Sequence, residues 1–299
     1  MEAWLMGLRA AQYAAASVVL GLPAFMLYAG GVFGGQPPRW TRPVLGAGAA
    51  ALTLLALAAL TLQTGLMAGT PDQALNPEAL GFVVGATALG AAYAVRAGAA
   101  LLLVLTVLVL PPGRGLWCVA LGLGLIVAAN FAWTGHGAAT EGAGRWLHLT
   151  ADILHAVAAL IWLGAVFAFL VLATRRIEGD AASQTALASA LSGFARVGTL
   201  CVAVLLVTGL INSAFLVSFA RALTLGETPY GRLLALKLVA FAAMLGLAAL
   251  HRFRSTPALE RGEGGLSGLR LSLGAELALG LLILALVGAM GMLAPPVSL

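Results

Sequence analysis

The stretch WLHLTADILHAVAALIWLGAVFAFLVL, residues 146–172, decides the fold of this chain. It is apolar and longer than the roughly 20 residues that a helix needs to cross a bilayer. Its ionisable residues are His148, Asp152 and His155. At about 100° per residue, a helix places these three side chains on one face, and Trp162 falls on the same face. Because burying ionisable groups in a membrane is costly, the stretch predicts a membrane span with a functional site.

The composition of the whole chain indicates an integral membrane protein. Of its 299 residues, 61% are hydrophobic and 9% are charged, whereas soluble domains contain roughly 25% charged residues. We attribute the net charge of +5 to loops on one side of the membrane and expect no nucleic-acid partner. Both cysteines, Cys118 and Cys201, lie within apolar runs, which favours small packed side chains over a disulfide or metal ligands.

Further apolar segments predict an all-α polytopic membrane protein with about eight transmembrane helices. The first span lacks a basic leader and a small-residue cleavage site, so we interpret it as a retained span and not as a signal peptide. We expect a single transmembrane domain over residues 1–299, with a first four-helix half over 1–135 and a second over 146–293. The expected spans cover residues 10–32, 43–68, 91–110, 116–135, 146–172, 197–219, 232–250 and 270–293.

Basic residues are distributed unequally between the two sets of loops. Because positive residues favour the cytoplasmic side, the richer set predicts a multi-pass protein of a bacterial inner membrane with both termini in the periplasm. The polar face of residues 146–172 then begins near the periplasmic surface. The richer set is Arg39, Arg42, Arg114, Arg175, Arg176, Arg196, Arg252, Arg254, Arg261 and Arg270, and the poorer set is Arg9, Arg145, Arg221 and Arg232.

The two halves share short patterns. Thr-Gly-Leu closes the second span at 64–66 and the sixth at 208–210. Each is followed by a polar connection and a span with a basic residue six positions after a glycine, Arg96 in one case and Lys237 in the other. An offset near 140 residues predicts a parallel 4+4 repeat, as known in some transporters.

Arg96, Asp152 and Lys237 all fall one to two helical turns below the periplasmic ends of their spans. The simplest interpretation pairs Asp152 with one of the two cations, while the other extends toward the interface. A carboxylate can also orient a histidine through the ring nitrogen that binds no metal. Asp152 lies within one turn of His148 and of His155, and the two roles are compatible.

A third histidine, His136, follows the fourth span in the motif Thr-Gly-His-Gly at 134–137. A short connection leads to the next span, so His136 is expected near His148 and His155. Three imidazoles and Asp152 suit Cu(II) or Zn(II), whereas Cu(I) prefers added sulfur ligands. Methionines that could supply sulfur lie near the same ends of their spans, although packing explains each of them more simply. They are Met67, Met290 and Met292.

Toward the cytoplasmic side, Glu276 lies about two turns inside the eighth span. We expect an ion pair with Arg196 or Arg252, with proton coupling as the alternative. His251 adjoins two arginines at the end of the seventh span, which favours a solvated or headgroup-facing side chain.

Several motifs resemble those of the bacterial copper resistance protein D family. Asp152-Ile-Leu-His155 followed by Trp162-Leu-Gly164 resembles the D-x-x-H and W-x-G of that family, and Gly135-His136 resembles its G-H motif. Motifs of its C-terminal domain follow in order at 194–196, 208–212, 228–237, 251–254 and 271–276.

This resemblance implies an inner-membrane protein of copper homeostasis. It implies that copper moves inward from a periplasmic copper-binding partner of the copper resistance protein C type. In that hypothesis His136 and His155 bind the ion, His148 assists and Asp152 orients or balances charge. The hypothesis requires no enzymatic activity, and it needs weak successive sites because a tight site would trap the ion.

Two alternatives remain open from the sequence. Arg96 and Lys237 would repel a metal cation unless they point away or are neutralised. They could instead hold the propionates of haem b, with histidines from different helices as axial ligands, in a protein that reduces Cu(II). The other alternative is a scaffold that docks the periplasmic copper carrier and binds no metal itself.

Overall fold

The computed structural model describes residues 2–34, 37–175, 181–217, 225–261, 263 and 266–298. In these ranges the chain forms eight helices that are long and apolar enough to cross a membrane, which confirms the predicted all-α polytopic class. The sixth candidate span begins at Thr185 and the seventh extends to Glu260, so both are longer than predicted. Arg176 and Arg221, which entered the charge comparison, lie outside the described residues.

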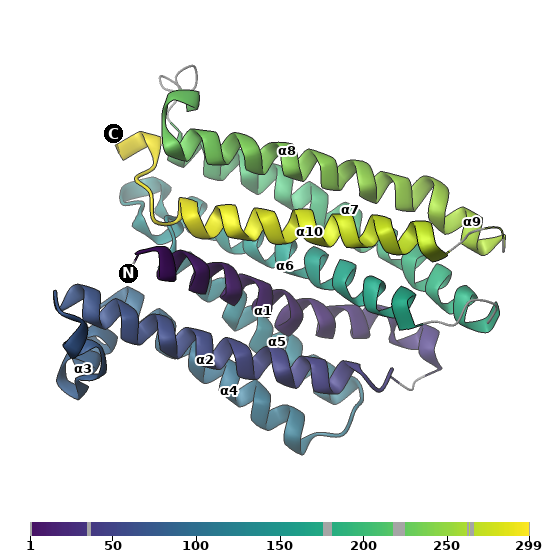
Figure 1. Cartoon of the computed structure of the whole chain (residues 1–299), viewed down its shortest axis with the longest axis horizontal. Coiled ribbons are helices and arrows are strands. Elements are labelled where there is room, and N and C mark those ends of the chain that lie inside the picture. Colours follow the sequence, from purple (N-terminus) through teal and green to yellow (C-terminus); the bar gives the residue numbers. More distant parts are fainter. Residues whose placement is uncertain are drawn as a thin grey trace.

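The long helices run roughly parallel to one axis of the molecule, and both chain termini lie at the same end (Figure 1). We call this end the terminal end and the other the opposite end. The spanning helices are α1 (Glu2–Ala29), α2 (Thr41–Met67), α4 (Ala88–Val109), α5 (Arg114–Asn130), α6 (Arg145–Arg175), α7 (Ala181–Leu216), α8 (Pro229–Leu250) and α10 (Leu266–Met290).

Shorter elements complete the connections. Residues 69–90, predicted as a loop, contain the 3₁₀ turn η2 (Pro71–Leu75) and the helix α3 (Pro77–Ala86). The side chain of Asn76 caps α3 by accepting from the backbone N–H of Glu78 at 2.9 Å, a favourable use of asparagine at a helix start. At the opposite end, α8 continues through the π-helical turn η8 (His251–Ser255) into α9 (Thr256–Glu260).

Helices α1 and α6 form the centre of the bundle. α1 packs against α2, α5, α6 and α10, and α6 packs against α1, α7 and α10. Gly21 of α1 faces Gly164 of α6, and a Cβ atom on either would collide with the backbone of the other helix. Glycines at a membrane helix crossing let the backbones approach closely, which compensates for the absence of a hydrophobic driving force between helices in lipid.

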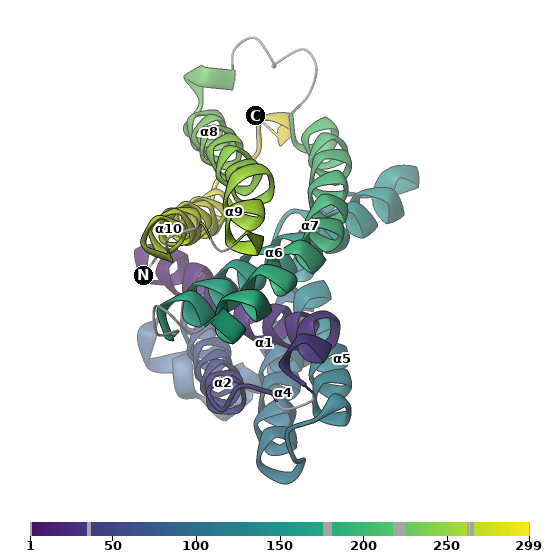
Figure 2. The same ribbon diagram turned by 90° about the vertical axis from the view of Figure 1, so that its right-hand side faces the viewer.

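Helices α7 and α8 lie on one side of this centre, and α2, α4 and α5 lie on the other (Figure 2). α7 packs mainly on α6, and α8 packs mainly on α10. The polar cavities described below are lined by residues from α6, α7, α8 and α10, so the second half of the chain contains most of the candidate site.

The starts of α4 and α8 have the same local construction. Thr87 caps α4 by accepting from the N–H of Gly90 at 2.9 Å, and Thr228 caps α8 by accepting from the N–H of Gly231 at 3.0 Å. A Cβ atom on either glycine would collide with a carbonyl oxygen of the preceding segment. This likeness supports the parallel repeat, which stays a hypothesis.

Candidate functional site

A cavity of about 180 Å³ lies near the terminal end, between α6, α7, α8 and α10. We call it the terminal cavity. Arg9 and Tyr13 of α1, together with residues of the segment 131–137, complete its wall. The four residues predicted as copper ligands all line it: His136, His148, Asp152 and His155. The fold therefore brings them to one cavity from two separate segments of the chain.

His155 has one ring nitrogen fixed by the protein. Its Nδ1 lies 2.9 Å from the hydroxyl oxygen of Thr208 on α7, and that hydroxyl donates its hydrogen to the carbonyl oxygen of Val204 at 2.6 Å. The threonine oxygen therefore accepts from His155 Nδ1–H, and the lone pair remains on Nε2. Gly209 packs against the ring, where a Cβ would lie 3.6 Å from Cε1. Such a fixed second nitrogen is how proteins orient a metal-binding imidazole.

The carboxylate of Asp152 is held by an amide and by a glycine. Asn212 of α7 donates from Nδ2 to Oδ1 at 3.3 Å, and a Cβ atom on Gly137 would collide with the carboxylate. The ion pairs found among the described residues join His251 to Glu276 and Arg261 to Glu263. Asp152 therefore makes no direct ion pair with Arg96 or Lys237, although Lys237 is the cation that acts on it electrostatically.

Arg96 does not face the terminal cavity. Its side chain is 1% exposed and donates to Gln12 Oε1 at 2.6 Å and to Thr134 Oγ1 at 3.0 Å. Its guanidinium also lies 3.9 Å from the centre of the Phe131 ring. Neutral acceptors and an aromatic face thus compensate the buried charge, and the prediction that Arg96 pairs with Asp152 or extends toward the interface is not met.

Lys237 differs from Arg96 because it lines the terminal cavity. Its ammonium makes no hydrogen bond or ion pair among the described ranges of the chain, yet it is close enough to act electrostatically on Asp152 and His155. A cation bound beside these two residues would therefore be repelled by the positive charge of Lys237. Arg9 also lines the cavity, but it donates to Thr134 O and Met292 Sδ.

His148 is more completely buried than its place near the start of α6 suggested. It is 1% exposed, its Nδ1 lies 2.6 Å from Thr140 Oγ1, and its ring stacks on Phe215 with centroids 4.8 Å apart. Its Nε2 is buried and has no hydrogen-bond partner. A buried ring nitrogen without a partner at a cavity wall is a candidate ligand. His136 is partly exposed, with Nε2 3.4 Å from the carbonyl oxygen of Met290.

The three methionines are separated by the fold. Met290 is buried and lines the terminal cavity. Met292 lies beyond the end of α10, where its sulfur accepts from Arg9 at 3.7 Å. Met67 is 49% exposed at the end of α2 and does not reach the cavity. Of the three, Met290 is therefore the best-placed candidate for sulfur ligation.

The ligand candidates share a cavity without forming a complete coordination sphere. Among the described residues, no group of three or more His, Cys, Asp or Glu side chains is close enough to hold one metal ion together. The arrangement can offer one or two ligands at a time, which suits transient binding better than storage.

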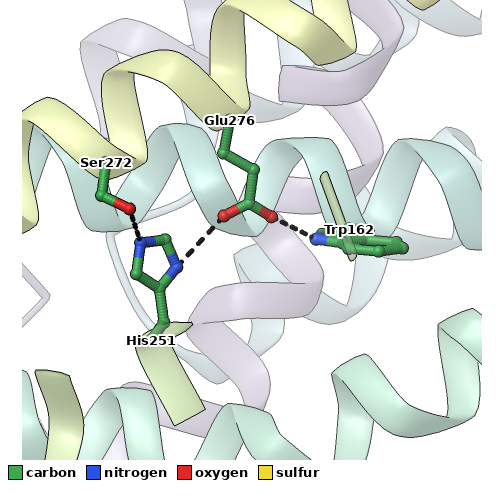
Figure 3. Close-up of polar contacts among 4 residues, drawn as sticks. All are labelled: Trp162, His251, Ser272 and Glu276. Atoms are coloured by element: carbon green, nitrogen blue, oxygen red, sulfur yellow. Dashed lines mark hydrogen bonds and ion pairs between the residues drawn. The ribbon is translucent and has the colours of Figure 1, made fainter. Parts of the chain in front are cut away.

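A second polar cluster lies toward the opposite end (Figure 3). Glu276 of α10 is 1% exposed and accepts from Trp162 Nε1 at 2.9 Å. Its other oxygen lies 3.1 Å from Nδ1 of His251, whose Nε2 lies 2.7 Å from Ser272 Oγ. The predicted pairing of Glu276 with Arg196 or Arg252 is wrong, and so is the prediction of a solvated His251, which is 7% exposed.

Sequence reasoning missed the polar partners that orient these groups. Thr208 stood out only as a mark of the repeat, although it fixes His155. Trp162 shares a helical face with His155, but it belongs to the Glu276 cluster. The η8 turn, which directs His251 toward α10, leaves the regular helical spacing and has no simple sequence signal.

Eight spanning helices and an interior cavity lined by three histidines and an aspartate define a polytopic membrane protein with ionisable side chains in its interior. Residues 1–146 match the family described as copper resistance protein D-like, N-terminal domain, and residues 188–290 match the family copper resistance protein D.

Two curated relatives agree with these matches. Copper resistance protein D of Pseudomonas syringae pv. tomato is 36% identical over 265 residues, which cover 85% of this chain and 84% of the relative. Copper transport protein CutJ of Bacillus subtilis is 30% identical over 286 residues, 92% of this chain and 50% of the relative. No solved structure matches. The chain belongs to the copper resistance protein D family.

Proposed function

We propose that this protein moves copper across the bacterial inner membrane, from the periplasm to the cytoplasm, through the terminal cavity. The observation that supports this most directly is His155, whose Nδ1–H is fixed by Thr208 while Nε2 keeps its lone pair in a cavity that also contains Asp152. Family membership supports copper as the ion.

The charge distribution supports the orientation in this proposal, and the inward direction is the direction that the family resemblance implies. Basic loop residues are concentrated toward the opposite end, which favours the cytoplasm there and the periplasm at the terminal end. His136 lies in the segment between α5 and α6 and is partly exposed. It is therefore placed to receive copper first, from a periplasmic copper-binding protein of the copper resistance protein C type. His148 or His155 would then take the ion deeper into the cavity.

In this proposal Lys237 promotes the release of copper from the site. Its charge raises the free energy of a cation bound between His155 and Asp152, and a site that binds too tightly would trap the ion. In this proposal Asp152 attracts copper and Lys237 limits its affinity. The process needs no enzymatic step by the protein.

Haem binding receives less support from the geometry. Arg96 is committed to Gln12 and Thr134 and does not line the terminal cavity, so Arg96 and Lys237 do not form a propionate pair. The volume of about 180 Å³ lies below the roughly 300–1,000 Å³ of pockets that hold cofactor-sized ligands.

Copper uptake by reconstituted vesicles tests the proposal. Vesicles with the wild-type protein and an internal copper indicator would receive Cu(II), Cu(I) in ascorbate, or copper bound to a copper resistance C-type protein. Uptake should fall at least tenfold in His155→Ala and stay unchanged in Met67→Leu, because Met67 lies outside the cavity. Equal uptake by wild type and His155→Ala would refute the proposed site, and absence of uptake by wild type would refute transport.

A further inference from the structure

A second and larger cavity lies at the opposite end of the same helices. Its volume is about 520 Å³, and α6, α7, α8, α9 and α10 contribute to its wall. We call it the opposite cavity. Glu276 and His251 line it, together with Trp162. The proposed entry of copper at the terminal cavity does not use these residues.

The cluster of Glu276, His251, Trp162 and Ser272 is arranged around a buried carboxylate (Figure 3). Trp162 Nε1–H can only donate, so it fixes Oε1 of Glu276 as an acceptor. Oε2 faces His251 Nδ1 at 3.1 Å. When His251 donates its Nε2–H to Ser272 Oγ, the lone pairs of Nδ1 and Oε2 point at the same place. A cation must then lie between them, either a proton or a metal ion.

The separation of these two atoms fits a metal ion. Bonds of about 2.0–2.1 Å from a metal to nitrogen and to oxygen, spanning the observed 3.1 Å, would enclose an angle of roughly 100°. This is close to the angle between neighbouring ligands in tetrahedral or tetragonal copper and zinc sites. His251 and Glu276 could therefore bind an ion with little movement.

The other charged groups around the cluster do not prevent a cation from binding between His251 and Glu276. Arg252 lines the same cavity but donates to Thr199 Oγ1 at 2.8 Å on α7. Glu260 of α9 also lines the cavity and adds negative charge. The buried carboxylate of Glu276 thus has His251 as its ion-pair partner in the described part of the chain.

The two cavities are linked by residues on common helices. On α8, Lys237 lines the terminal cavity and His251 follows the helix at the opposite cavity, with Met244 seven residues from each. Seven residues of helix span about 10 Å. Met244 is 5% exposed, and its thioether is a soft ligand between the two ends. Leu163 packs against Gly280 at an intermediate depth and closes the seam between α6 and α10.

We propose that His251 and Glu276 form a second copper site, from which the ion leaves toward the cytoplasm. This inference rests on the proposed copper transport and adds the exit site. Copper would replace the proton shared by Nδ1 and Oε2 and would lie to one side of the line between these atoms, as an angle of roughly 100° at the metal requires. The Nε2–H bond to Ser272 orients the ring, and Trp162 holds the carboxylate.

Copper binding to the purified full-length protein in detergent tests the exit site. Wild type, incubated with a Cu(II) salt and then desalted, should retain about one more copper equivalent than Glu276→Gln or His251→Ala, because an imidazole and a carboxylate suit Cu(II). Glu263→Gln is the matched control, because it neutralises an exposed glutamate that pairs with Arg261 and does not line the opposite cavity, and it should retain nearly the wild-type amount. Size-exclusion profiles confirm that the variants remain folded.

Trp162 gives an independent readout at the same site. Copper between Glu276 and His251 should quench its fluorescence, so the copper-dependent quenching should be smaller in Trp162→Phe and in Glu276→Gln than in wild type. Unchanged copper content and quenching in Glu276→Gln would overturn the exit site. If only His155→Ala loses copper, the transport proposal stands and the exit site fails. If His155→Ala keeps all its copper while Glu276→Gln loses it, the assigned entry site fails instead.

Discussion

Arg96 on α4 and Lys237 on α8 stand at similar places in the two halves, nine residues after the threonines that cap their helices. Arg96 is enclosed by Gln12, Thr134 and Phe131. Lys237 faces a cavity that contains Asp152 and His155. The same local framework thus encloses the hydrogen-bonded guanidinium of Arg96 in the first half, and places Lys237 at a cavity with Asp152 and His155 in the second.

This difference shows why a buried charge need not mark a functional site. Arg96 satisfies its donors within the protein, so its position is explained by packing and hydrogen bonding. Lys237 has no such partners, and the groups around it could bind a cation. The three predictions that follow test this contrast.

The largest effect is expected from Arg96→Met. It would leave buried acceptors on Gln12 and Thr134 without their donor, at a cost of about 1–3 kcal/mol for each. We expect a loss of about 3 kcal/mol in unfolding free energy, measured by unfolding in mixed micelles, with unchanged copper affinity of the folded fraction. A large loss of copper affinity with full stability would contradict the structural role.

The next effect concerns the threonines of the repeated Thr-Gly-Leu motif. Thr208 and Thr64 both donate to the carbonyl oxygen four residues before them, but only Thr208 accepts from a histidine among the described contacts. Thr208→Val should weaken copper binding about 10–100-fold, because the orienting partner of His155 is lost. Thr64→Val is the matched control and should leave copper binding unchanged. Equal effects of the two substitutions in a copper titration would refute the asymmetry.

The smallest effect is expected from Lys237→Met. Removing the positive charge should tighten copper binding several-fold and slow copper release, since the repulsion of a bound cation disappears. Stability should change little, because the ammonium has no hydrogen-bond partner to lose. Competition with a copper chelator measures the affinity. Weaker binding in this variant would show that Lys237 assists copper instead of limiting it.

The sequence predicted the class of fold well because membrane spans depend on length and hydropathy. Eight spans and the approach of His136 to the face of His148, Asp152 and His155 follow from those properties and from a short connection. Helical spacing also grouped Trp162 with this face. However, Trp162 lies two turns beyond His155, so His155 lines the terminal cavity and Trp162 lines the opposite cavity.

Which side chains pair with each other across neighbouring helices was not predictable in the same way. The pairing of Glu276 with His251 depends on the η8 turn and on how α8 packs against α10. Neither feature produces a periodic pattern in the sequence. The neutral partners of Arg96 were missed because we expected a charge to require an opposite charge. The amide oxygen of Gln12, the hydroxyl of Thr134 and the ring of Phe131 surround it instead.

The central claim is that copper binds to His155 in the terminal cavity, and the X-ray absorption spectrum of the copper-loaded protein tests it most directly. The sample is the Glu276→Gln variant loaded with one equivalent of copper. Its spectrum should show the scattering of an imidazole ligand. Adding His155→Ala should remove that contribution and most of the bound copper. An unchanged spectrum and copper content after this substitution would contradict the account.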